Sequence, residues 1–292
     1  MPPIIPAAFS EIKEIIFERN ETMDVKRLIP LLFFAFLFTF SSCMQTSIPI
    51  QTDSDVIEIN QPLEDVDISY VIDGDTFKVV GSDQSVRIVG IDTPEIHDSS
   101  KPIGEYGEEA KEYFEDFAQE YDVYIKKVGT DTYGRTLAYV FGKVDENEYA
   151  FYESSVVKQG LARPLIYDDN ADQYLTPKIV QSYKKAFEDK VGIFSKWDNA
   201  PVLTNAQNYK SYLGKIVFLE GKVTSVTNSN GWYNIYSDWF RINIREEEYQ
   251  YLFNNYNLYN LKGKTVRFYG ELWDENGRPE ILLRSPNEIL LN

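Results

Sequence analysis

Between residues 66 and 200, apolar residues follow either a strand-like or a helix-like pattern. Four segments are rich in Val, Ile, Tyr and Phe, a composition that predicts β-strands: residues 66–80, 85–91, 123–128 and 136–141. In a charged segment after Gly104, apolar residues instead recur at helical spacing: Ala110, Tyr113, Phe114, Phe117 and Ala118. Helices are also expected over residues 149–160 and 171–190, because Gly160 and Gly192 are typical helix stops. The pattern predicts a β unit on the scale of five strands with three helices.

A second run of strand-like patterns begins near residue 205. Residues 213–223 and 261–272 echo each other, because each is an apolar stretch interrupted by Gly. Shorter strands and a helix complete the set: strands at 233–236, 240–244 and 280–283, and a helix at 246–253. Five strands with a helix before the fourth resemble an OB-fold, so residues 205–292 are expected to form a second small β-barrel.

The N-terminal part of the chain has the layout of an export signal. An apolar run of 13 residues, Leu28–Phe40, follows two basic residues and precedes small residues and Cys43. The run is short for a membrane span, which needs about 20 residues. The alternative interpretation is an uncleaved anchor or a buried core segment. Residues 1–22 are acidic in a way that is unusual before an export signal, so Met23 is an alternative start of translation.

The segment Phe40-Ser41-Ser42-Cys43 resembles the lipobox of a bacterial lipoprotein signal. This resemblance implies that Cys43 becomes the acylated N-terminus, so that the protein is lipid-anchored in the bacterial cell envelope after export. Residues 44–65 are rich in Ser, Thr, Gln, Asp and Pro without periodicity, which predicts a flexible tether. The predicted organisation is an extension with a signal peptide, a tether and two domains: residues 1–43, 44–65, 66–197 and 205–292.

Composition narrows the chemistry that the chain can carry out. Its net charge is −17; residues 44–200 contain 15 basic and 31 acidic residues, whereas residues 201–292 contain 10 of each. Bulk charge therefore cannot hold nucleic acid, since non-specific affinity comes mostly from neutralised phosphates, and any such chemistry must be local to a site. The single Cys excludes an intramolecular disulfide and a Cys-rich zinc site, and the single His excludes a His-clustered metal centre.

Four acidic residues and one Arg gather at the ends of two predicted strands within residues 70–95. They are Asp73, Asp75, Arg87, Asp92 and Glu95. The first two acids are two positions apart, so extended backbone directs both carboxylates to one face, and Gly74 permits a tight bend between them. The last two acids end the second strand, where Pro94 stops further pairing. Carboxylates attract a hard divalent cation and Arg attracts phosphate, which together suggest metal-assisted phosphodiester chemistry.

Each of these motifs also has a plainer interpretation. Asp-Gly between β-rich runs is a common hairpin signal, and Asp92-Thr93-Pro94 is typical of a turn. An ordinary hairpin, however, needs neither Asp75 nor an Arg in a strand close to Asp92 and Glu95. The combination therefore favours a functional site over two turns.

Six motifs in order resemble the thermonuclease, or staphylococcal-nuclease-like, family over residues 66–197, about 45% of the chain. They are I-D-G-D-T at 72–76, V-R-I-V-G-I-D-T-P-E at 86–95, Y-G-E-E-A at 106–110, D-T-Y-G-R-T-L-A-Y-V at 131–140, V-K-Q-G-L-A-R at 157–163 and G-I-F-S at 192–195. The resemblance implies an OB-type five-stranded barrel with three helices. The expected fold class of the chain is thus mainly β with helices (α+β), with a second OB-fold-like barrel after the first.

The resemblance also implies a role for each matched residue. The matched Ca²⁺ ligands are Asp73, Asp75, Asp92 and the backbone carbonyl of Thr93, all oxygen donors of the kind that Ca²⁺ prefers. Glu95 matches the residue that orients or deprotonates the attacking water. Arg87 and Arg135 match the pair that holds the scissile phosphate, and Tyr133 matches a Tyr that contacts the nucleotide. The implied reaction is calcium-assisted in-line attack by water, which leaves 5′-hydroxyl and 3′-phosphate ends.

Some positions depart from the family pattern or have plainer alternatives. Thr132 stands where the family commonly has a Lys near the terminal phosphate, and the nucleotide-stacking Tyr falls on Ile166 or, one place later, on Tyr167. Arg135 follows Tyr-Gly in a tight turn, and alone it would be interpreted as a solvated hairpin charge. His97 is expected to be an exposed loop residue. The acidic composition of the domain predicts weak, salt-sensitive substrate binding.

The C-terminal unit resembles OB-folds of the nucleic-acid-binding type. Its aromatic residues either form a surface on which bases stack, with the arginines contacting phosphates, or fill the interior of a small barrel. They are Trp232, Tyr233, Tyr236, Trp239 and Phe240, with Arg241, Arg245 and Arg278. Core packing is favoured for the inward-facing residues, and nucleic-acid binding stays open as the alternative.

The resemblance thus implies a monomeric, envelope-anchored, calcium-dependent nuclease that acts on DNA, RNA or both. The alternatives are a non-catalytic nucleic-acid-binding protein that uses the fold as a scaffold, and a structural envelope lipoprotein. Scaffolds of this fold typically lose the carboxylates and arginines of the site. Every matched one is present here, so the enzyme interpretation is favoured.

Overall fold

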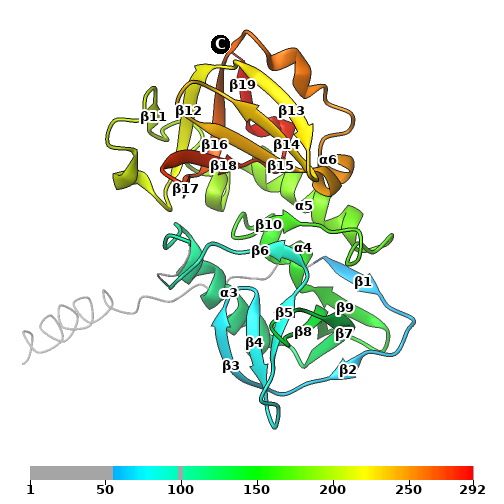
Figure 1. Ribbon diagram of the computed structural model, residues 1–292. Helices are drawn as coiled ribbons and strands as arrows, with labels where there is room; N and C mark the ends of the chain where they lie inside the picture. Colours follow the sequence, from blue (N-terminus) through cyan, green and yellow to red (C-terminus); the bar gives the residue numbers. More distant parts are fainter. Residues whose placement is uncertain (1–54, 98–100, 292) are drawn as a thin grey trace, which may run out of the picture. The chain divides into compact units, whose positions relative to one another are not determined.

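The computed structural model describes residues 55–97 and 101–291, all of which belong to one unit. Figure 1 shows that this part of the chain is built mainly from β-strands. Its four α-helices are α3 (Gly107–Glu120), α4 (Tyr152–Lys158), α5 (Thr176–Asp189) and α6 (Glu246–Leu252). The predicted fold class, mainly β with helices, is confirmed.

The first sheet has the strand order β1-β9-β8-β5-β4-β3, with β7 pairing with β8 and β2 pairing with β7. Its strands are β1 (Val56–Glu58), β2 (Glu64–Asp65), β3 (Ile68–Asp73), β4 (Thr76–Val79), β5 (Ser85–Ile88), β7 (Val123–Thr130), β8 (Thr136–Lys143) and β9 (Glu148–Phe151). β3 and β4 form an antiparallel hairpin that reverses at Gly74-Asp75, and β5 pairs with β4 on one side and β8 on the other. A separate ladder joins β6 (Gly90–Asp92) to β10 (Arg163–Leu165). The strand ends that carry the predicted site residues are thus neighbours.

Helix α3 packs closely against the β3–β4 turn. It buries the apolar face that the sequence predicted: Ala110, Tyr113, Phe114 and Phe117. A Cβ atom at Gly74 would lie 2.8 Å from the Ala110 side chain, so this turn position has no room for a larger residue. The Tyr152 hydroxyl donates a hydrogen bond to the Gly74 carbonyl at 2.6 Å. Helix packing therefore fixes the turn between Asp73 and Asp75.

The C-terminal residues add two further sheets, of strand order β11-β12-β16-β19 and β13-β14-β15-β18-β17. The strands are β11 (Val202–Leu203), β12 (Ile216–Lys222), β13 (Ser225–Ser229), β14 (Trp232–Tyr236), β15 (Arg241–Arg245), β16 (Thr265–Glu271), β17 (Trp273–Glu275), β18 (Arg278–Leu282) and β19 (Ile289–Leu291). Their apolar residues form a second hydrophobic core with Val217, Ile235, Ile242, Phe268 and Ile281 among its members. The further interpretation of these sheets as an OB-fold stays a prediction.

The two cores draw on both halves of the chain. Ile216, Phe218 and Tyr269 belong to the first core, although they follow the predicted domain boundary near residue 205. Ile166, which precedes that boundary, belongs to the second core. The halves therefore share buried apolar contacts, and the boundary itself stays a prediction.

The tether prediction was wrong over residues 55–65. Within this stretch β1 pairs with β9, and β2 pairs with β7. Ile57 and Ile59 are buried in the first core. Pairing and apolar burial thus order a segment whose polar composition predicted a flexible chain.

Several predicted bounds were also wrong. Residues 148–151 form strand β9, paired with β8, and not the start of a helix. Helix α5 begins at Thr176, because Asp172 turns the preceding chain by accepting hydrogen bonds from the Tyr174 and Leu175 N–H groups. Strand β13 is polar and lies at a sheet edge, so its sequence gave no strand signal.

The predicted export signal, Leu28–Phe40, and Cys43 lie outside the described residues. Within residues 55–97 and 101–291, none of the helices is long and apolar enough to cross a membrane.

Candidate active site

Asp73 and Asp75 lie on either side of Gly74 in the β3–β4 turn, as their spacing predicted. The Asp73 carboxylate accepts a hydrogen bond from the Asp75 N–H at 3.0 Å. The Asp75 carboxylate accepts one from the Thr76 hydroxyl at 3.0 Å. It also accepts hydrogen bonds from the N–H and the hydroxyl of Thr93, at 2.8 and 3.0 Å. Asp75 therefore ties the hairpin turn to the end of β6, where the second pair of acids begins.

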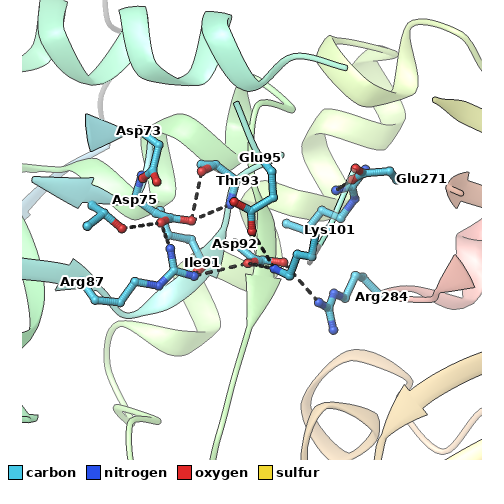
Figure 2. A network of polar contacts seen from close by, with 12 residues as sticks. Asp73, Asp75, Arg87, Ile91, Asp92, Thr93, Glu95, Lys101, Glu271 and Arg284 are labelled. Atoms are coloured by element: carbon cyan, nitrogen blue, oxygen red, sulfur yellow. Dashed lines mark hydrogen bonds and ion pairs between the residues drawn. The ribbon is translucent and has the colours of Figure 1, made fainter. Parts of the chain in front are cut away.

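Arg87 links the two pairs of acids. It lies opposite Thr76 in the β4–β5 ladder. Its guanidinium forms an ion pair with Asp75, approaches Asp92 Oδ1 at 3.3 Å and donates a hydrogen bond to the Ile91 carbonyl at 3.2 Å. Figure 2 shows the guanidinium between the two carboxylates.

These side chains line a small pocket of about 160 Å³. Its lining residues are Asp73, Asp75, Thr76, Arg87, Asp92, Thr93, Pro94, Glu95, Lys101 and Arg135. All four predicted metal ligands and all three predicted catalytic residues are among them. Segments that lie far apart in the sequence thus converge where the sequence predicted one site.

Arg135 and Tyr133 come from the loop between β7 and β8. Arg135 Nε donates a hydrogen bond to Asp131 Oδ2 at 2.7 Å, so it is a paired hairpin charge, yet it also lines the pocket. Tyr133 is 85% exposed and is not part of the pocket lining. Its ring centroid lies 5.6 Å from the Arg135 guanidinium carbon. The structure therefore places Arg135 in the site and Tyr133 beside it.

Lys101 is a pocket residue that the sequence analysis missed. Its ammonium lies 3.0 Å from Glu95 Oε1 and 3.8 Å from Asp92 Oδ1. It also lies 5.1 Å from the ring centroid of Trp273, which belongs to β17. Lys101 stands outside the quoted motifs, so only the excess of acids around the site could have indicated a further counter-cation.

The cations of the pocket control the ionisation of Asp92. Burial alone would raise the pKa of this carboxyl group, but Lys101, Arg87 and Arg284 outweigh burial and lower the pKa to about 2. The opposite holds for Asp73, whose pKa is raised by burial despite the charge of Arg87. Asp92 is therefore ionised at neutral pH and available to a cation.

The donor set suits a hard divalent cation such as Ca²⁺. Three carboxylates and Thr93 line one pocket, and Ca²⁺ prefers oxygen donors of this kind. Among the residues that the structure describes, no three His, Cys, Asp or Glu side chains form a ready-made metal cluster. Arg87 lies between Asp75 and Asp92. The residues thus fit the cation in the chemistry of their donors, and binding it would require Arg87 to move away from at least one carboxylate.

The pocket lining includes neither candidate for the nucleotide-stacking position. Ile166 is 1% exposed and belongs to the second core. Tyr167 is half-buried, and its ring centroid lies 5.4 Å from the Arg245 guanidinium carbon. His97 is exposed, as expected.

The aromatic residues of the C-terminal unit divide into two groups. Phe240 is buried, and Tyr233 and Trp239 pack against the second core, as core packing predicted. Trp232 is half-buried but is not among the residues packed against that core; its ring centroid lies 5.0 Å from the Arg245 guanidinium carbon. Core packing thus accounts for three of the five side chains and leaves two candidates for stacking, Trp232 and Tyr236, whose ring centroid lies 5.7 Å from the Arg278 guanidinium carbon.

Comparisons with known proteins agree with this geometry. Residues 85–196 match the family model of staphylococcal nuclease homologues. The chain is 38% identical to a thermonuclease of Staphylococcus hyicus over 130 residues, which are 43% of this chain and 72% of the relative. It is 34% identical to a thermonuclease of Staphylococcus intermedius over 133 residues, 44% of this chain and 75% of the relative. It is also 32% identical to the endonuclease YncB of Bacillus subtilis over 143 residues, 46% of this chain and 63% of the relative.

Proposed function

The chain belongs to the thermonuclease family and is a nuclease of that type, and from this premise we propose that it hydrolyses DNA, RNA or both in a calcium-dependent reaction. The single observation that carries the proposal is the pocket itself. Four candidate metal ligands, a candidate base and two arginines line its volume of about 160 Å³. Acids alone would suit a cation and arginines alone would suit an anion, whereas both together suit a phosphodiester that is bound beside a metal ion.

The candidate metal ligands would supply oxygen donors from two strand ends. Asp73, Asp75, Asp92 and the Thr93 carbonyl would hold Ca²⁺, which supplies positive charge to a phosphate oxygen when it is bound. These residues come from rigid backbone, because the hydrogen bonds of Asp75 join the β3–β4 turn to Thr93. These hydrogen bonds hold the candidate ligands in place, so the change that cation binding requires is the movement of Arg87 away from a carboxylate.

Glu95 is the proposed base. Glu95 lies beside Lys101, whose ammonium is 3.0 Å from the Glu95 carboxylate. Its carboxylate orients a water molecule toward the phosphorus and accepts the proton of that water. The new bond joins the water oxygen to phosphorus, and the bond from phosphorus to the 5′ oxygen breaks. Protonation of that oxygen completes a 5′-hydroxyl end and leaves a 3′-phosphate on the other fragment.

Arg87 and Arg135 are the proposed phosphate ligands. Both are now paired with carboxylates, Arg87 with Asp75 and Asp92 and Arg135 with Asp131. A planar guanidinium can donate two parallel hydrogen bonds, so each can contact a phosphate oxygen while it keeps part of its present pairing. Charge that builds on the phosphoryl oxygens is then stabilised by two guanidinium cations.

We further propose that the nuclease is a monomer anchored in the cell envelope through acylated Cys43. The anchor rests on the sequence of residues 23–43 alone. Metabolic labelling with a radioactive fatty acid should mark the full-length protein, and Cys43→Ala should remove the label. An unlabelled wild-type protein would contradict the anchor and leave the nuclease proposal intact.

The reaction is tested by incubating the full-length chain with single-stranded DNA or RNA, in Ca²⁺ or with a chelator. Fragments are expected in the presence of Ca²⁺ and not in the presence of the chelator. The 5′ ends of these fragments should accept phosphate from polynucleotide kinase without prior dephosphorylation. Cleavage that persists in chelator would contradict the calcium dependence. Fragments with 5′-phosphate ends would contradict the direction of attack.

A further inference from the structure

A buried arginine of the C-terminal half reaches the acids of the pocket. Arg284 follows strand β18 and is 2% exposed. Its Nη2 lies 3.7 Å from Asp92 Oδ2, whereas Arg87 and Lys101 approach the other oxygen, Oδ1. Figure 2 shows that Arg284 approaches Asp92 from a different direction than Arg87 does. The family motifs end at residue 195, so the contact comes from a part of the chain that the matched nuclease region does not include.

Arg284 is fixed by carboxylates at both of its ends. Its Nη1 forms an ion pair with Glu248 of helix α6, which is completely buried. Its backbone N–H donates a hydrogen bond to Glu288 Oε2 at 2.7 Å. Glu288 and Ser285 also form a capping box on the short helix Pro286–Glu288. With side chain and backbone both held, the guanidinium cannot easily turn away from Asp92.

A second ion pair supports the strand that carries Asp92. Arg163 lies opposite Asp92 in the β6–β10 ladder, and its Nη1 lies 2.7 Å from Oε2 of Glu271 in β16. Both side chains are buried. Trp273, just beyond Glu271, contacts the Lys101 ammonium. The C-terminal residues therefore contact the pocket, or the strand beneath it, at three points.

We propose that Arg284 is a positioning residue of the nuclease reaction. It holds Oδ2 of Asp92, so that Oδ1 stays on the side of Arg87 and Lys101, where the proposed cation would bind. The C-terminal half then completes the catalytic centre and does not act as a separate module. The inference rests on the proposed function, since Asp92 is a proposed metal ligand. Residues that orient a metal ligand without touching the metal typically contribute about 10–100-fold to metal affinity.

Removal of Arg284 has two opposing consequences, which the test must separate. Loss of its positive charge favours a cation in the pocket, whereas loss of its contact with Asp92 disfavours one. Replacing Glu248 together with Arg284 leaves the net charge unchanged. It also avoids leaving the buried Glu248 without Arg284, and the other partner of Glu248, Arg245, has a side chain that is 19% exposed and can be solvated. The double variant Arg284→Met, Glu248→Met therefore isolates the positioning effect.

A matched control exists in the same half of the chain. Arg241 Nε lies 2.9 Å from Glu280 Oε2, across the β15–β18 ladder, and neither residue lines the pocket. Ca²⁺ binding to full-length protein is measured by titration calorimetry without substrate, and thermal unfolding is followed by circular dichroism. The Arg284 and Glu248 variant should bind Ca²⁺ about 10-fold more weakly than wild type. Arg241→Met, Glu280→Met should leave Ca²⁺ affinity unchanged.

A single variant, Arg284→Lys, provides a second measurement if the double variant does not fold. It keeps the charge and the partner Glu248, but one ammonium cannot contact Glu248 and Asp92 as a guanidinium fork does. Ca²⁺ affinity should again fall while the protein stays folded. Ca²⁺ affinity equal to wild type in the Arg284 variants would overturn the positioning role and leave the proposed function intact. Absence of Ca²⁺ binding by wild type would overturn both.

Discussion

Two of the regions in which carboxylates meet arginines differ in whether the carboxylates line a cavity. In the pocket, Asp73, Asp75, Asp92 and Glu95 line an open volume. Near helix α6, Glu248 and Glu288 are 0% and 3% exposed, and protein groups occupy their oxygens. Glu248 pairs with Arg245 and Arg284, and Glu288 accepts hydrogen bonds from the Tyr183 hydroxyl and two backbone N–H groups.

The difference shows what separates a structural ion pair from a site. The same residue types stabilise packing where internal donors satisfy every acceptor, because a buried charge is tolerated only when it is paired. Carboxylates and arginines become candidate functional residues where a cavity allows a ligand to reach them. Arg284 belongs to both regions, since one face contacts Glu248 and the other contacts Asp92.

Removal of an arginine from the pocket should have the largest effect. Arg135→Met is expected to lower kcat by about 10²–10³-fold, because one fixed charge on the transition state is lost. Its side chain is 33% exposed, so the free energy of unfolding should change little. Steady-state cleavage of single-stranded DNA measures the effect.

The control for Arg135 is an arginine of the C-terminal sheets. Arg267 pairs with Glu220 between β16 and β12 and lies outside the pocket lining. Arg267→Met should keep kcat close to that of wild type. Equal losses in the two variants would remove the distinction between pocket arginines and structural ones.

The structural acids predict a pH dependence of stability. Burial raises the pKa of Glu288 to about 7, although hydrogen bonds from Tyr183 and the Arg284 backbone oppose the rise. The folded protein then keeps a proton that the unfolded chain releases near pH 4.3. This contribution to stability is complete below about pH 4 and is lost as the pH rises through 7, with a total of about 3 kcal/mol.

Glu288→Gln isolates that contribution, because the amide does not titrate. Urea unfolding of wild type and variant is compared between pH 5 and pH 8. The free energy of unfolding should fall more steeply with pH in wild type than in the variant. Parallel pH profiles would show that another group binds the proton, and they would weaken the view of Glu288 as a buried structural acid.

A smaller effect is expected from the tryptophans of the C-terminal sheets. Trp239 packs against Phe240, with ring centroids 4.9 Å apart, so Trp239→Ala should lower the free energy of unfolding by about 2–3 kcal/mol. Trp232 is half-buried outside the core, and Trp232→Ala should cost less than about 1 kcal/mol. Thermal unfolding measures both. If Trp232 stacks on bases, its variant should lose affinity for single-stranded DNA at an unchanged melting temperature.

The smallest expected effect is that of salt on substrate binding. Arg87, Arg135 and Lys101 are the cations of the pocket, in a domain that is strongly acidic. Three phosphate contacts predict about a 20-fold loss of affinity for a single strand between 50 and 200 mM salt. Fluorescence anisotropy of a labelled oligonucleotide bound to Glu95→Gln, in which cleavage is slowed, measures it. A binding constant independent of salt would mean that these cations do not carry the affinity.

Much of the pocket could be predicted from the sequence, because its acids occupy strand ends that local patterns mark. The Asp-Gly-Asp spacing places Asp73 and Asp75 in one turn, and Pro94 marks the end of β6. These are short-range signals, and the structure places the residues around one cavity. Their convergence in space depends on the β4–β5 and β5–β8 ladders and on the hydrogen bonds from Thr93 to Asp75.

The remaining features depend on long-range contacts that local patterns do not encode. Arg284 lies 192 positions after Asp92 in the sequence, and the two meet only in the folded chain. Lys101 follows no motif and reaches Glu95 from a loop. Strand β1 is short, and Ile57 is its single buried residue. The polar composition of the surrounding segment, which predicted a flexible tether, therefore outweighed this weak strand pattern.

The central claim, that the acid and arginine pocket is the catalytic centre, is tested most directly by one comparison. Cleavage of single-stranded DNA in Ca²⁺ is measured for full-length wild type and for Arg87→Ala, Glu95→Gln. Calcium-dependent cleavage by wild type and its loss in the double variant, at an unchanged fold by circular dichroism, is the result that we predict. Full cleavage by the double variant would contradict the claim.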